Sequence, residues 1–569
     1  MRVLFSAVFT LFFLVCAKAQ DVPQSRNYPQ NVFRYPIDLE PETAGSFGEL
    51  RPNHFHSGLD FRTNQRTGYP VHAAYDGYVS RIRSQIGGFG YALYIAHPNG
   101  FTSVYAHLDR FSPAILKAMR DRQKQEKSFA VDFPLDPFQI PVRKNEVVAW
   151  SGNTGASGGP HLHFELRDSQ TEATINPSLF GLRIPDSKAP TLYGFYVYDL
   201  GGKPFNENTP KTRVPILGSG GSYKLAKTGV LNLSGEAGFG LIAYDFNSAS
   251  ANRNGIYSIQ LNMDGKTYYT FAVERFAFDQ THAINAHIDY PAYEAGRTMI
   301  QKAFVDPGNR ATLYPVRENN GRLRFDDGAL HDIEILVKDV AGNTSALKFR
   351  VKAGTEPFSP PKISGENYFR WNQENVLNAG DMRLRIPEGN LYDDVQFSWV
   401  KKARVPGAFS DTYKLHNRFT PVHDSYELWI KPDAAAEKFA DKLVIVNERR
   451  QSQGGAFENG MVKGNPKGFG EFYLLADTVP PLITPINIAD GKNMAKTAGI
   501  YLRIGDNLSG IKKYEGFIDG EWVLFEYNFR NGMVGYAFDE TLKPGKHELS
   551  FRVVDGKDNA REYTAAFYR

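Results

Sequence analysis

Residues 53–62 read NHFHSGLDFR and residues 161–166 read HLHFEL, and these two stretches decide the fold of the N-terminal part of the chain. In both, polar and apolar side chains alternate, which is typical of a β-strand that buries one face. The alternation predicts His56, Gly58 and Asp60 on one face of the first strand. It predicts His161 and His163 on one face of the second, with Leu162, Phe164 and Leu166 in a core. Gly58 disfavours a helix and would leave room for an ion between His56 and Asp60.

The residue types on these faces indicate metal chemistry. If the two strands are neighbours, two imidazoles and a carboxylate meet, and a catalytic zinc uses three protein ligands with an open position for water. A single histidine on a strand is more often an ordinary surface or core residue. However, seven of the 13 histidines lie between residues 54 and 163, namely His54, His56, His72, His97, His107, His161 and His163. The glycine-rich segment SGNTGASGGP, residues 151–160, leads into the second strand and would let backbone approach a bound substrate.

Residues from about 31 to 168 resemble the lysostaphin-type (LytM-like) zinc metallopeptidases, which cut the peptide part of bacterial peptidoglycan. The family signature is H-x3-D, an intervening histidine and H-x-H, and it is matched in order by HSGLD, SVYAHL and SGNTGASGGPHLHFELR. The resemblance covers about a quarter of the chain. It implies an antiparallel β-sheet domain with its site in a groove. It also implies one zinc per chain bound by His56, Asp60 and His163, with His107 and His161 as the catalytic pair.

The resemblance also implies a mechanism. Zinc lowers the pKa of a bound water toward neutrality, and the two further imidazoles move protons or stabilise the oxyanion. The sequence does not assign these two roles between His107 and His161. Glu165 is either an orienting partner of an imidazole or an exposed strand carboxylate. Asn53 and Tyr105 are candidates for the groove lining.

One departure from the family pattern is the long connection of 53 residues between His107 and His161. Propensity predicts a helix over Pro113–Lys127 with Ser112 as N-cap, then a loop from Phe129 to Pro141. This insertion, around residues 112–140, is interpreted as a lid, a specificity element, a docking site for a regulator or a plain surface excursion.

The first 19 residues predict export. One basic residue is followed by an apolar run and then by Ala17-Lys18-Ala19, which is typical of a cleaved secretory signal peptide. The only cysteine, Cys16, lies inside this segment, and its lipidation is left open. We therefore expect no transmembrane segment after signal cleavage, and a location in the periplasm, the cell envelope or the extracellular space.

The C-terminal two-thirds contain an internal repeat that predicts β-sandwiches. Asp186-x3-Pro190 matches Asp477-x3-Pro481, and each copy continues with a strand ending at an aspartate, Asp245 or Asp506. Asp-Gly pairs then predict hairpin turns, and His331-x7-Asp339-x3-Asn343 matches His547-x7-Asp555-x3-Asn559. The histidines and aspartates of this last motif are interpreted as turn and strand-edge residues. The two copies resemble bacterial immunoglobulin-like domains.

The sequence as a whole predicts a mainly β protein. The predicted domains are a peptidase domain (20–185), an immunoglobulin-like domain (186–354), a β-sandwich-like domain (355–476) and a second immunoglobulin-like domain (477–569). A net charge of +4 is too small to indicate nucleic-acid binding. The expected partners are peptidoglycan peptides, and envelope proteins held through the β domains or the insertion. Two functions follow: an exported zinc endopeptidase of the cell wall, or a non-catalytic LytM-like scaffold that activates other wall hydrolases.

Overall fold

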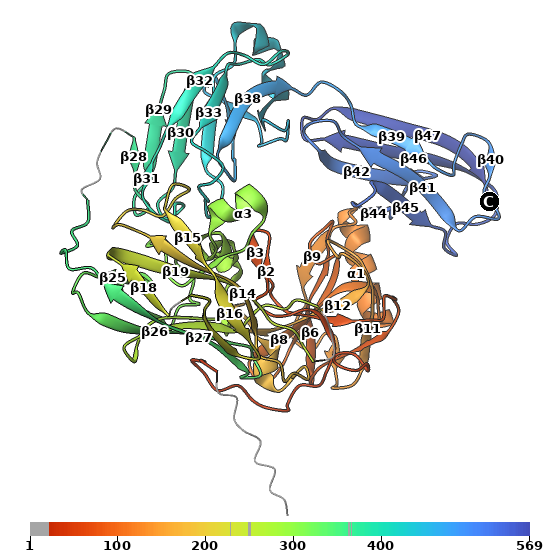
Figure 1. Ribbon diagram of the computed structural model, residues 1–569. Helices are drawn as coiled ribbons and strands as arrows, with labels where there is room; N and C mark the ends of the chain where they lie inside the picture. Colours follow the sequence, from red (N-terminus) through yellow and green to blue (C-terminus); the bar gives the residue numbers. More distant parts are fainter. Residues whose placement is uncertain (1–21, 228, 249–251, 362–364, 366) are drawn as a thin grey trace, which may run out of the picture.

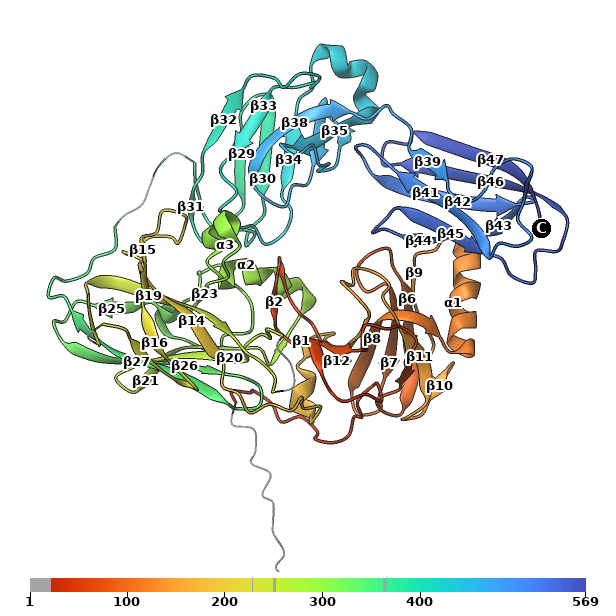
Figure 2. The same cartoon turned by 45° about the vertical axis from the view of Figure 1, so that its right-hand side comes forward.

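The computed structural model describes residues 22–227, 229–248, 252–361, 365 and 367–569. The predicted signal peptide and Cys16 lie outside these residues. The chain is mainly β, as predicted, and its β-sheets form successive units that curve round until the last unit returns to the first (Figures 1 and 2). No helix among the described residues has the length and apolar character needed to span a membrane.

The first unit is built on a 12-stranded sheet whose main path runs β1-β4-β12-β8-β7-β6-β10. Its strands are β1 (Thr43–Gly45), β4 (Leu59–Arg62), β5 (Pro70–His72), β6 (Gly77–Ser84), β7 (Tyr91–Ala96), β8 (Phe101–Phe111), β9 (Val131–Pro134), β10 (Pro141–Val142), β11 (Val147–Ser151), β12 (His161–Asp168), β13 (Thr174–Ile175) and β22 (Arg275–Phe276). A separate hairpin joins β2 (Leu50–Arg51) to β3 (His54–Phe55). The two sequence stretches are neighbours, because β4 pairs antiparallel with β12.

The predicted first strand is wrong in one respect: it is broken at residues 56–58, between β3 and β4. The break arises because the backbone of His56 bonds to Gly48 and Glu49, at 2.8 and 3.0 Å, and not to β12. Glycine is needed at position 58 for a different reason from the predicted one, which was to leave room for an ion. A Cβ built there would lie 2.4 Å from the carbonyl oxygen of Phe164, so glycine is required for the close approach of β12.

The insertion contains the predicted helix, α1 (Pro113–Glu126), with Ser112 at its N-cap. Ile115 and Met119 on its inner side are fully buried. The predicted loop after the helix is partly a strand, since β9 pairs with β6 and buries Val131 and Phe133. The insertion is therefore part of the core of the first unit and not a plain surface excursion.

The second unit contains the first copy of the sequence repeat and has two sheets. One sheet runs β15 (Lys211–Val214), β14 (Thr191–Asp199), β19 (Gly235–Tyr244) and β23 (Gln301–Lys302), with β25 (Leu323–Phe325) beside β19. The other runs β16 (Ile216–Ser219), β17 (Ser222–Leu225), β27 (Thr344–Ala353), β26 (Leu330–Lys338), β20 (Ser258–Met263), β21 (Lys266–Ala272) and β24 (Val316–Arg317), with β18 (Val230–Leu233) beside β27.

The fourth unit repeats this plan, and the third lies between them. In the fourth, β39 (Leu482–Pro485), β41 (Gly499–Gly505), β45 (Met533–Ala537) and β44 (Glu526–Asn528) face β40 (Lys492–Asn493), β47 (Ala560–Tyr568), β46 (Lys546–Asp555), β42 (Ile511–Ile518) and β43 (Glu521–Val523). The third unit has sheets β29 (Asn375–Asn378), β30 (Met382–Ile386), β34 (Glu427–Ile430), β37 (Met461–Gly464), β36 (Ala456–Glu458) and β32 (Trp399–Lys402), β33 (Thr412–Leu415), β38 (Gly470–Ala476), β35 (Leu443–Asn447). In both repeat copies the strand before the Asp-Gly turn pairs with the strand that carries the repeat histidine.

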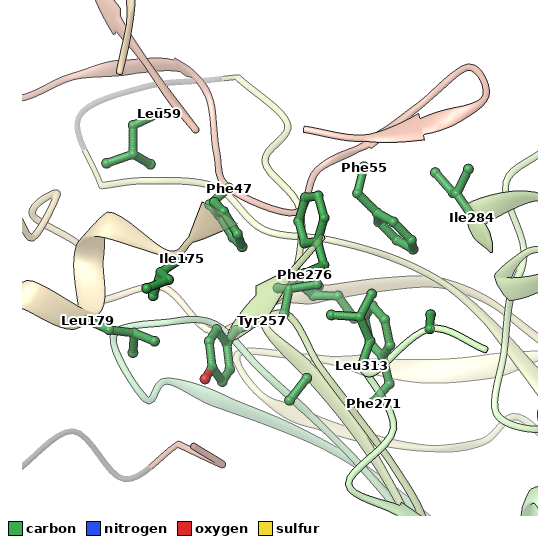
Figure 3. Close-up of a cluster of buried hydrophobic side chains, with 14 of the residues drawn as sticks. Phe47, Phe55, Leu59, Ile175, Leu179, Tyr257, Phe271, Phe276, Ile284 and Leu313 are labelled. Carbon is green, nitrogen blue, oxygen red and sulfur yellow. The ribbon is translucent and has the colours of Figure 1, made fainter. Parts of the chain in front are cut away.

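The first two units share one hydrophobic core. Phe47 and Phe55 of the first unit pack against Phe276 of the second, with ring centroids 5.2 and 5.9 Å apart, and Phe271 lies next to Phe55 (Figure 3). The sheet of the first unit also extends into the second, because β13 pairs with β22, whose residues lie in the stretch of chain that forms the second unit. Residues 56–58, which include the predicted ligand His56, therefore directly follow a residue of this shared core.

Substituting Phe55 tests this shared core. Phe55 is 1% exposed, so we expect Phe55→Ala to lower the free energy of unfolding by about 3–5 kcal/mol. The matched control is Phe138→Ala, since Phe138 is 77% exposed and its loss should change stability by less than about 0.5 kcal/mol. Denaturant unfolding followed by tryptophan fluorescence measures both. Equal effects of the two substitutions would contradict a shared core.

Candidate metal centre and active site

The structure brings together the three residues predicted as ligands. His163 lies opposite Asp60 in the β4–β12 pair, which places both side chains on the same face. His163 Nδ1 is 2.8 Å from Asp60 Oδ1, and His56 Nε2 is 3.1 Å from each of these atoms. Three donor atoms thus surround one point, and all three side chains are buried.

Each ligand is oriented by a second contact on its far side. His56 Nδ1–H donates to the carbonyl of Ser46 at 2.7 Å, which turns Nε2 toward the cluster. His163 Nε2–H donates to Glu165 Oε1 at 2.9 Å, which leaves Nδ1 for the cluster. Arg51 donates to the outer oxygen of Asp60 at 2.7 Å. Such partners fix the tautomer and raise the basicity of metal-binding imidazoles.

Glu165 is not an exposed strand carboxylate, because its side chain is fully buried. It accepts hydrogen bonds from His163 and from Ser57 Oγ, at 2.9 and 2.5 Å, and it pairs with Arg167 at 2.6 Å. Burial acts to raise the pKa of Glu165, but Arg167, His163 and Ser57 outweigh it and lower the pKa to about 2. Glu165 is therefore an anion at neutral pH and lies behind His163, one of the predicted ligands.

The electrostatics of the cluster favour a positive charge. Burial acts to lower the pKa of His163, yet hydrogen bonds and charges from Asp60 and Glu165 outweigh it and raise the pKa to about 9. Burial likewise opposes ionisation of Asp60, but the neighbouring His56, His161 and His163 hold its pKa well below the ordinary value.

The donor set also fits zinc by size. Ligand atoms at about 2.0–2.1 Å from a tetrahedral ion lie about 3.3 Å apart, close to the 2.8–3.1 Å seen between these three donors. Two imidazole nitrogens and one carboxylate oxygen form a typical three-ligand set of catalytic zinc sites.

His107 reaches the site through a distortion of β8. Ala106 lies opposite His163, so in a regular strand the next side chain would point to the other face. His107 instead has φ = +58°, and the pairing of β8 with β7 shifts register around it. This bulge turns the ring of His107 toward the site, 4.8 Å from the ring of His161 and 5.8 Å from that of His163. Burial, with help from the neighbouring imidazoles, lowers the pKa of His107 to about 3, so its ring is neutral.

His107 and His161 each have Nδ1 bound to a backbone carbonyl and Nε2 on the side of the cluster. His107 Nδ1–H donates to the carbonyl of Thr154 at 2.9 Å, and His161 Nδ1–H donates to that of Gly159 at 2.8 Å. In both rings Nε2 is left as a proton acceptor, and Nε2 of His161 lies 3.4 Å from Asp60 Oδ1. The glycine-rich loop thus orients both imidazoles. Its Gly155 has φ = +68°, and a Cβ there would lie 2.2 Å from the backbone nitrogen of Gly90.

Some sequence candidates lie elsewhere. His72 and His97 bond to the carbonyls of Asn145 and Asp76, and His54 is exposed, so three of the seven clustered histidines take no part in the site. Tyr105 is fully buried beneath the sheet and cannot line a groove. Arg51 and Ser46 were missed by the sequence reasoning, because no periodicity links them to the ligands that they orient.

Comparison with known proteins identifies a family that resembles the N-terminal part of the chain. Residues 54–124 match the family model Peptidase family M23, so the chain contains an M23 domain and the resemblance to zinc metallopeptidases is confirmed. Residues 366–477 match the model of a Zu5-like domain.

The similar curated proteins match about a quarter of the chain. The chain is 34% identical over 131 residues to the DD-carboxypeptidase/endopeptidase Mpg of Neisseria meningitidis serogroup B, which covers 23% of this chain and 24% of the relative. It is 33% identical over 142 residues to an uncharacterized metalloprotease of Haemophilus influenzae, with the same coverage. The chain thus spans about a quarter of the length of these relatives. A solved zinc containing peptidase from Vibrio cholerae is 27% identical over 24% of this chain and 37% of that one, with a TM-score of 0.18.

The anion behind His163 gives a test of the site. We expect Glu165→Gln to weaken zinc binding by about 10- to 100-fold, because the amide no longer holds His163 in the ligating tautomer. The matched control is Glu172→Gln, since Glu172 also pairs with Arg167, at 3.2 Å, but is exposed and does not touch His163. Competition with a chromogenic chelator measures the zinc affinity. Equal affinities for Glu165→Gln and the control would refute this role of Glu165.

Proposed function

We propose that this chain is an exported zinc metalloendopeptidase that hydrolyses peptide bonds of bacterial peptidoglycan during wall remodelling or division. The observation that carries the proposal is the convergence of His56, Asp60 and His163 with two further imidazoles whose free nitrogens face them. A scaffold that only bound the wall would have no need of oriented proton acceptors beside a ligand cluster.

In this proposal His56, Asp60 and His163 hold one zinc ion. The ion would supply a Lewis acid that polarises a carbonyl and lowers the pKa of water toward neutrality. His161 Nε2, the free imidazole nitrogen next to Asp60, accepts the proton of the attacking water. His107 Nε2 accepts a hydrogen bond from the same water and so orients it. The proton on His161 then passes to the leaving amine.

The substrate and the location follow from the relatives' names and from the N-terminus. A DD-carboxypeptidase/endopeptidase and the Vibrio cholerae peptidoglycan DD-endopeptidase ShyA, 28% identical over 139 residues, support a peptidoglycan peptide as substrate. This polymer lies outside the cytoplasm, which agrees with the predicted signal peptide of residues 1–19.

The primary experiment measures metal content and digestion of purified sacculi together. We expect about one zinc per chain and cleavage of muropeptide crosslinks by the unsubstituted protein. His163→Ala should lose both zinc and cleavage. His161→Ala should keep zinc but lose about 10²–10⁴-fold in rate, because only proton transfer is removed. His72→Ala is the control for both measurements, because His72 bonds to the carbonyl of Asn145 and takes no part in the site.

Two outcomes would overturn the proposal. Zinc binding with no cleavage of sacculi would favour the non-catalytic scaffold. Absence of zinc from the unsubstituted protein would refute the ligand assignment.

The fourth unit lies against the glycine-rich loop and α1. Arg530 donates to the carbonyls of Ser157 and Gly155, and Arg120 on α1 pairs with Glu526 at 2.6 Å. A cleft of about 870 Å³ lies between the two units, lined among others by Gly90, Thr154 and Trp522. We propose that this contact narrows access of the wall polymer to the site.

The ion pair in this contact is weak. Arg120 and Glu526 are each more than a third exposed, and such pairs contribute about 1 kcal/mol or less. By contrast, the fourth unit meets the third through buried apolar side chains, since Leu508 packs on Val444, Val446 and Tyr473. If the contact opened, the fourth unit would separate from the first and would keep its apolar contact with the third.

Charge reversal tests this contact. We expect Glu526→Arg to raise the rate of sacculus cleavage by up to about fivefold, because the ion pair becomes a repulsion. The double variant Arg120→Glu/Glu526→Arg restores the pair and should return the rate to that of the unsubstituted protein. A rate that is unchanged in Glu526→Arg, or that stays altered in the double variant, would show that the contact does not limit access.

A further inference from the structure

Two clusters of three carboxylates lie far from the metal centre in sequence, one in each copy of the repeat. Asp186, Asp245 and Asp339 form the first, and Asp477, Asp506 and Asp555 form the second. In each cluster, one oxygen from every residue lies within 4.8 Å of the other two. All six aspartates occupy the repeat positions that align the two copies, so the same arrangement has been built twice.

Two of these aspartates, Asp339 and Asp555, were predicted together with His331 and His547 to be turn and strand-edge residues, and that prediction is only half right. The histidines do serve the turns: His331 and His547 bond to the aspartates of the Asp-Gly turns at 2.7 and 2.6 Å. Asp339 and Asp555 also cap turns, through Asn343 and Asn559. However, Asp339 is 2% exposed and Asp555 is fully buried, which a turn cap does not require.

In the described residues, the carboxylates of the two clusters form no close ion pair with a basic side chain. No side-chain nitrogen of lysine, arginine or histidine among these residues forms an ion pair within 4.0 Å of any of the six carboxylates. Like charges this close in a buried place repel strongly and lose their hydration. Each cluster therefore needs either a cation or bound protons.

Unpaired oxygens point to a cation. Among the described residues, Asp245 Oδ1, Asp477 Oδ1 and Asp506 Oδ1 are buried atoms without a hydrogen-bond partner. The independent sign is Asn254, a residue outside the carboxylate set. It is 1% exposed, neither atom of its amide has a partner, and it lines the same cavity of about 40 Å³ as Asp186 and Asp245. A buried amide oxygen left unpaired beside carboxylates is a typical cation ligand.

We propose that each repeat copy binds one Ca²⁺ ion, through Asp186, Asp245, Asp339 and Asn254 in the first copy and through Asp477, Asp506 and Asp555 in the second. Ca²⁺ takes oxygen ligands at 2.3–2.6 Å, so two oxygens bound to one ion lie at most about 5 Å apart, in agreement with the clusters. Mg²⁺ demands a stricter octahedron and retains its water, so it fits these irregular protein ligands less well.

The alternative is neutralisation by protons. Burial, together with the charges of Asp339 and Asp186, raises the pKa of Asp245 to about 8, and burial raises that of Asp339 to about 6. The two possibilities predict opposite effects of an Asp→Asn substitution on the stability of the protein. With Ca²⁺ bound, Asp→Asn removes a ligand and destabilises; without it, Asp→Asn removes a repulsion and stabilises.

The experiment uses the full chain, freed of calcium and supplied with one equivalent of zinc. Equilibrium dialysis with ⁴⁵Ca²⁺ should give two ions per chain, and 2 mM CaCl₂ should raise the melting temperature. Asp245→Asn and Asp506→Asn should each bind one ion, and the double variant none. The matched control is Asp332→Asn, because Asp332 is an exposed aspartate on β26, the strand that ends just before Asp339. His163→Ala should keep both ions, which separates these sites from the zinc site.

Binding of fewer than two ions at 2 mM CaCl₂ would overturn the proposal. So would a melting temperature in Asp245→Asn and Asp506→Asn that equals or exceeds that of the calcium-treated unsubstituted protein. The dialysis of the unsubstituted chain decides the question even if a variant fails to fold.

Discussion

The site depends on the register of three antiparallel strands. Because His163 of β12 lies between Asp60 of β4 and Ala106 of β8, a slip of one residue in either pairing would turn His163 into the core. Leu162, Phe164 and Leu166 fill the opposite face and fix this register by burial. Loops beside the sheet then orient the imidazoles of the site. Ser46 accepts a hydrogen bond from His56, and carbonyls of the glycine-rich loop accept hydrogen bonds from His107 and His161.

The second unit is a structural neighbour of this site and not a remote appendage. Gly255 donates to Ser46 Oγ at 2.9 Å, and the carbonyl of Ser46 orients His56. Asn254, the residue before Gly255, lines the same cavity as Asp186 and Asp245 of the first aspartate cluster. A short chain of contacts therefore connects the first aspartate cluster to His56, through Gly255 and Ser46. Phe55, next to His56 in the chain, packs in the core shared by the two units.

Much of the site could be predicted from the sequence because its chemistry is local. The alternation around His163 and the H-x3-D spacing fix which side chains share a face, and the helix α1 follows from propensity and from its N-terminal Ser-Pro pair. The rest depends on contacts between distant residues. The break of the strand at His56 is set by bonds to Gly48 and Glu49, and the turn of His107 into the site by a left-handed bulge that no sequence pattern marks. The burial of Asp339 and Asp555 was missed because a D-x3-N turn reads the same in sequence at the surface and in the interior.

The pairing of β13 with β22 and the aromatic core around Phe276 have a consequence for how such chains can be rearranged during evolution. An exchange that transferred the M23 domain alone would leave Phe47 and Phe55 facing water and an unpaired strand edge at residues 174–175, both of which promote aggregation. The unit that can move between chains is therefore the first and second sheet units together. The third unit is partly tied to this pair, because its Tyr392 is buried in the shared core and donates to the carbonyl of His282 at 2.9 Å. The fourth unit touches the first through polar groups such as Arg120 and Glu526 and is easier to replace.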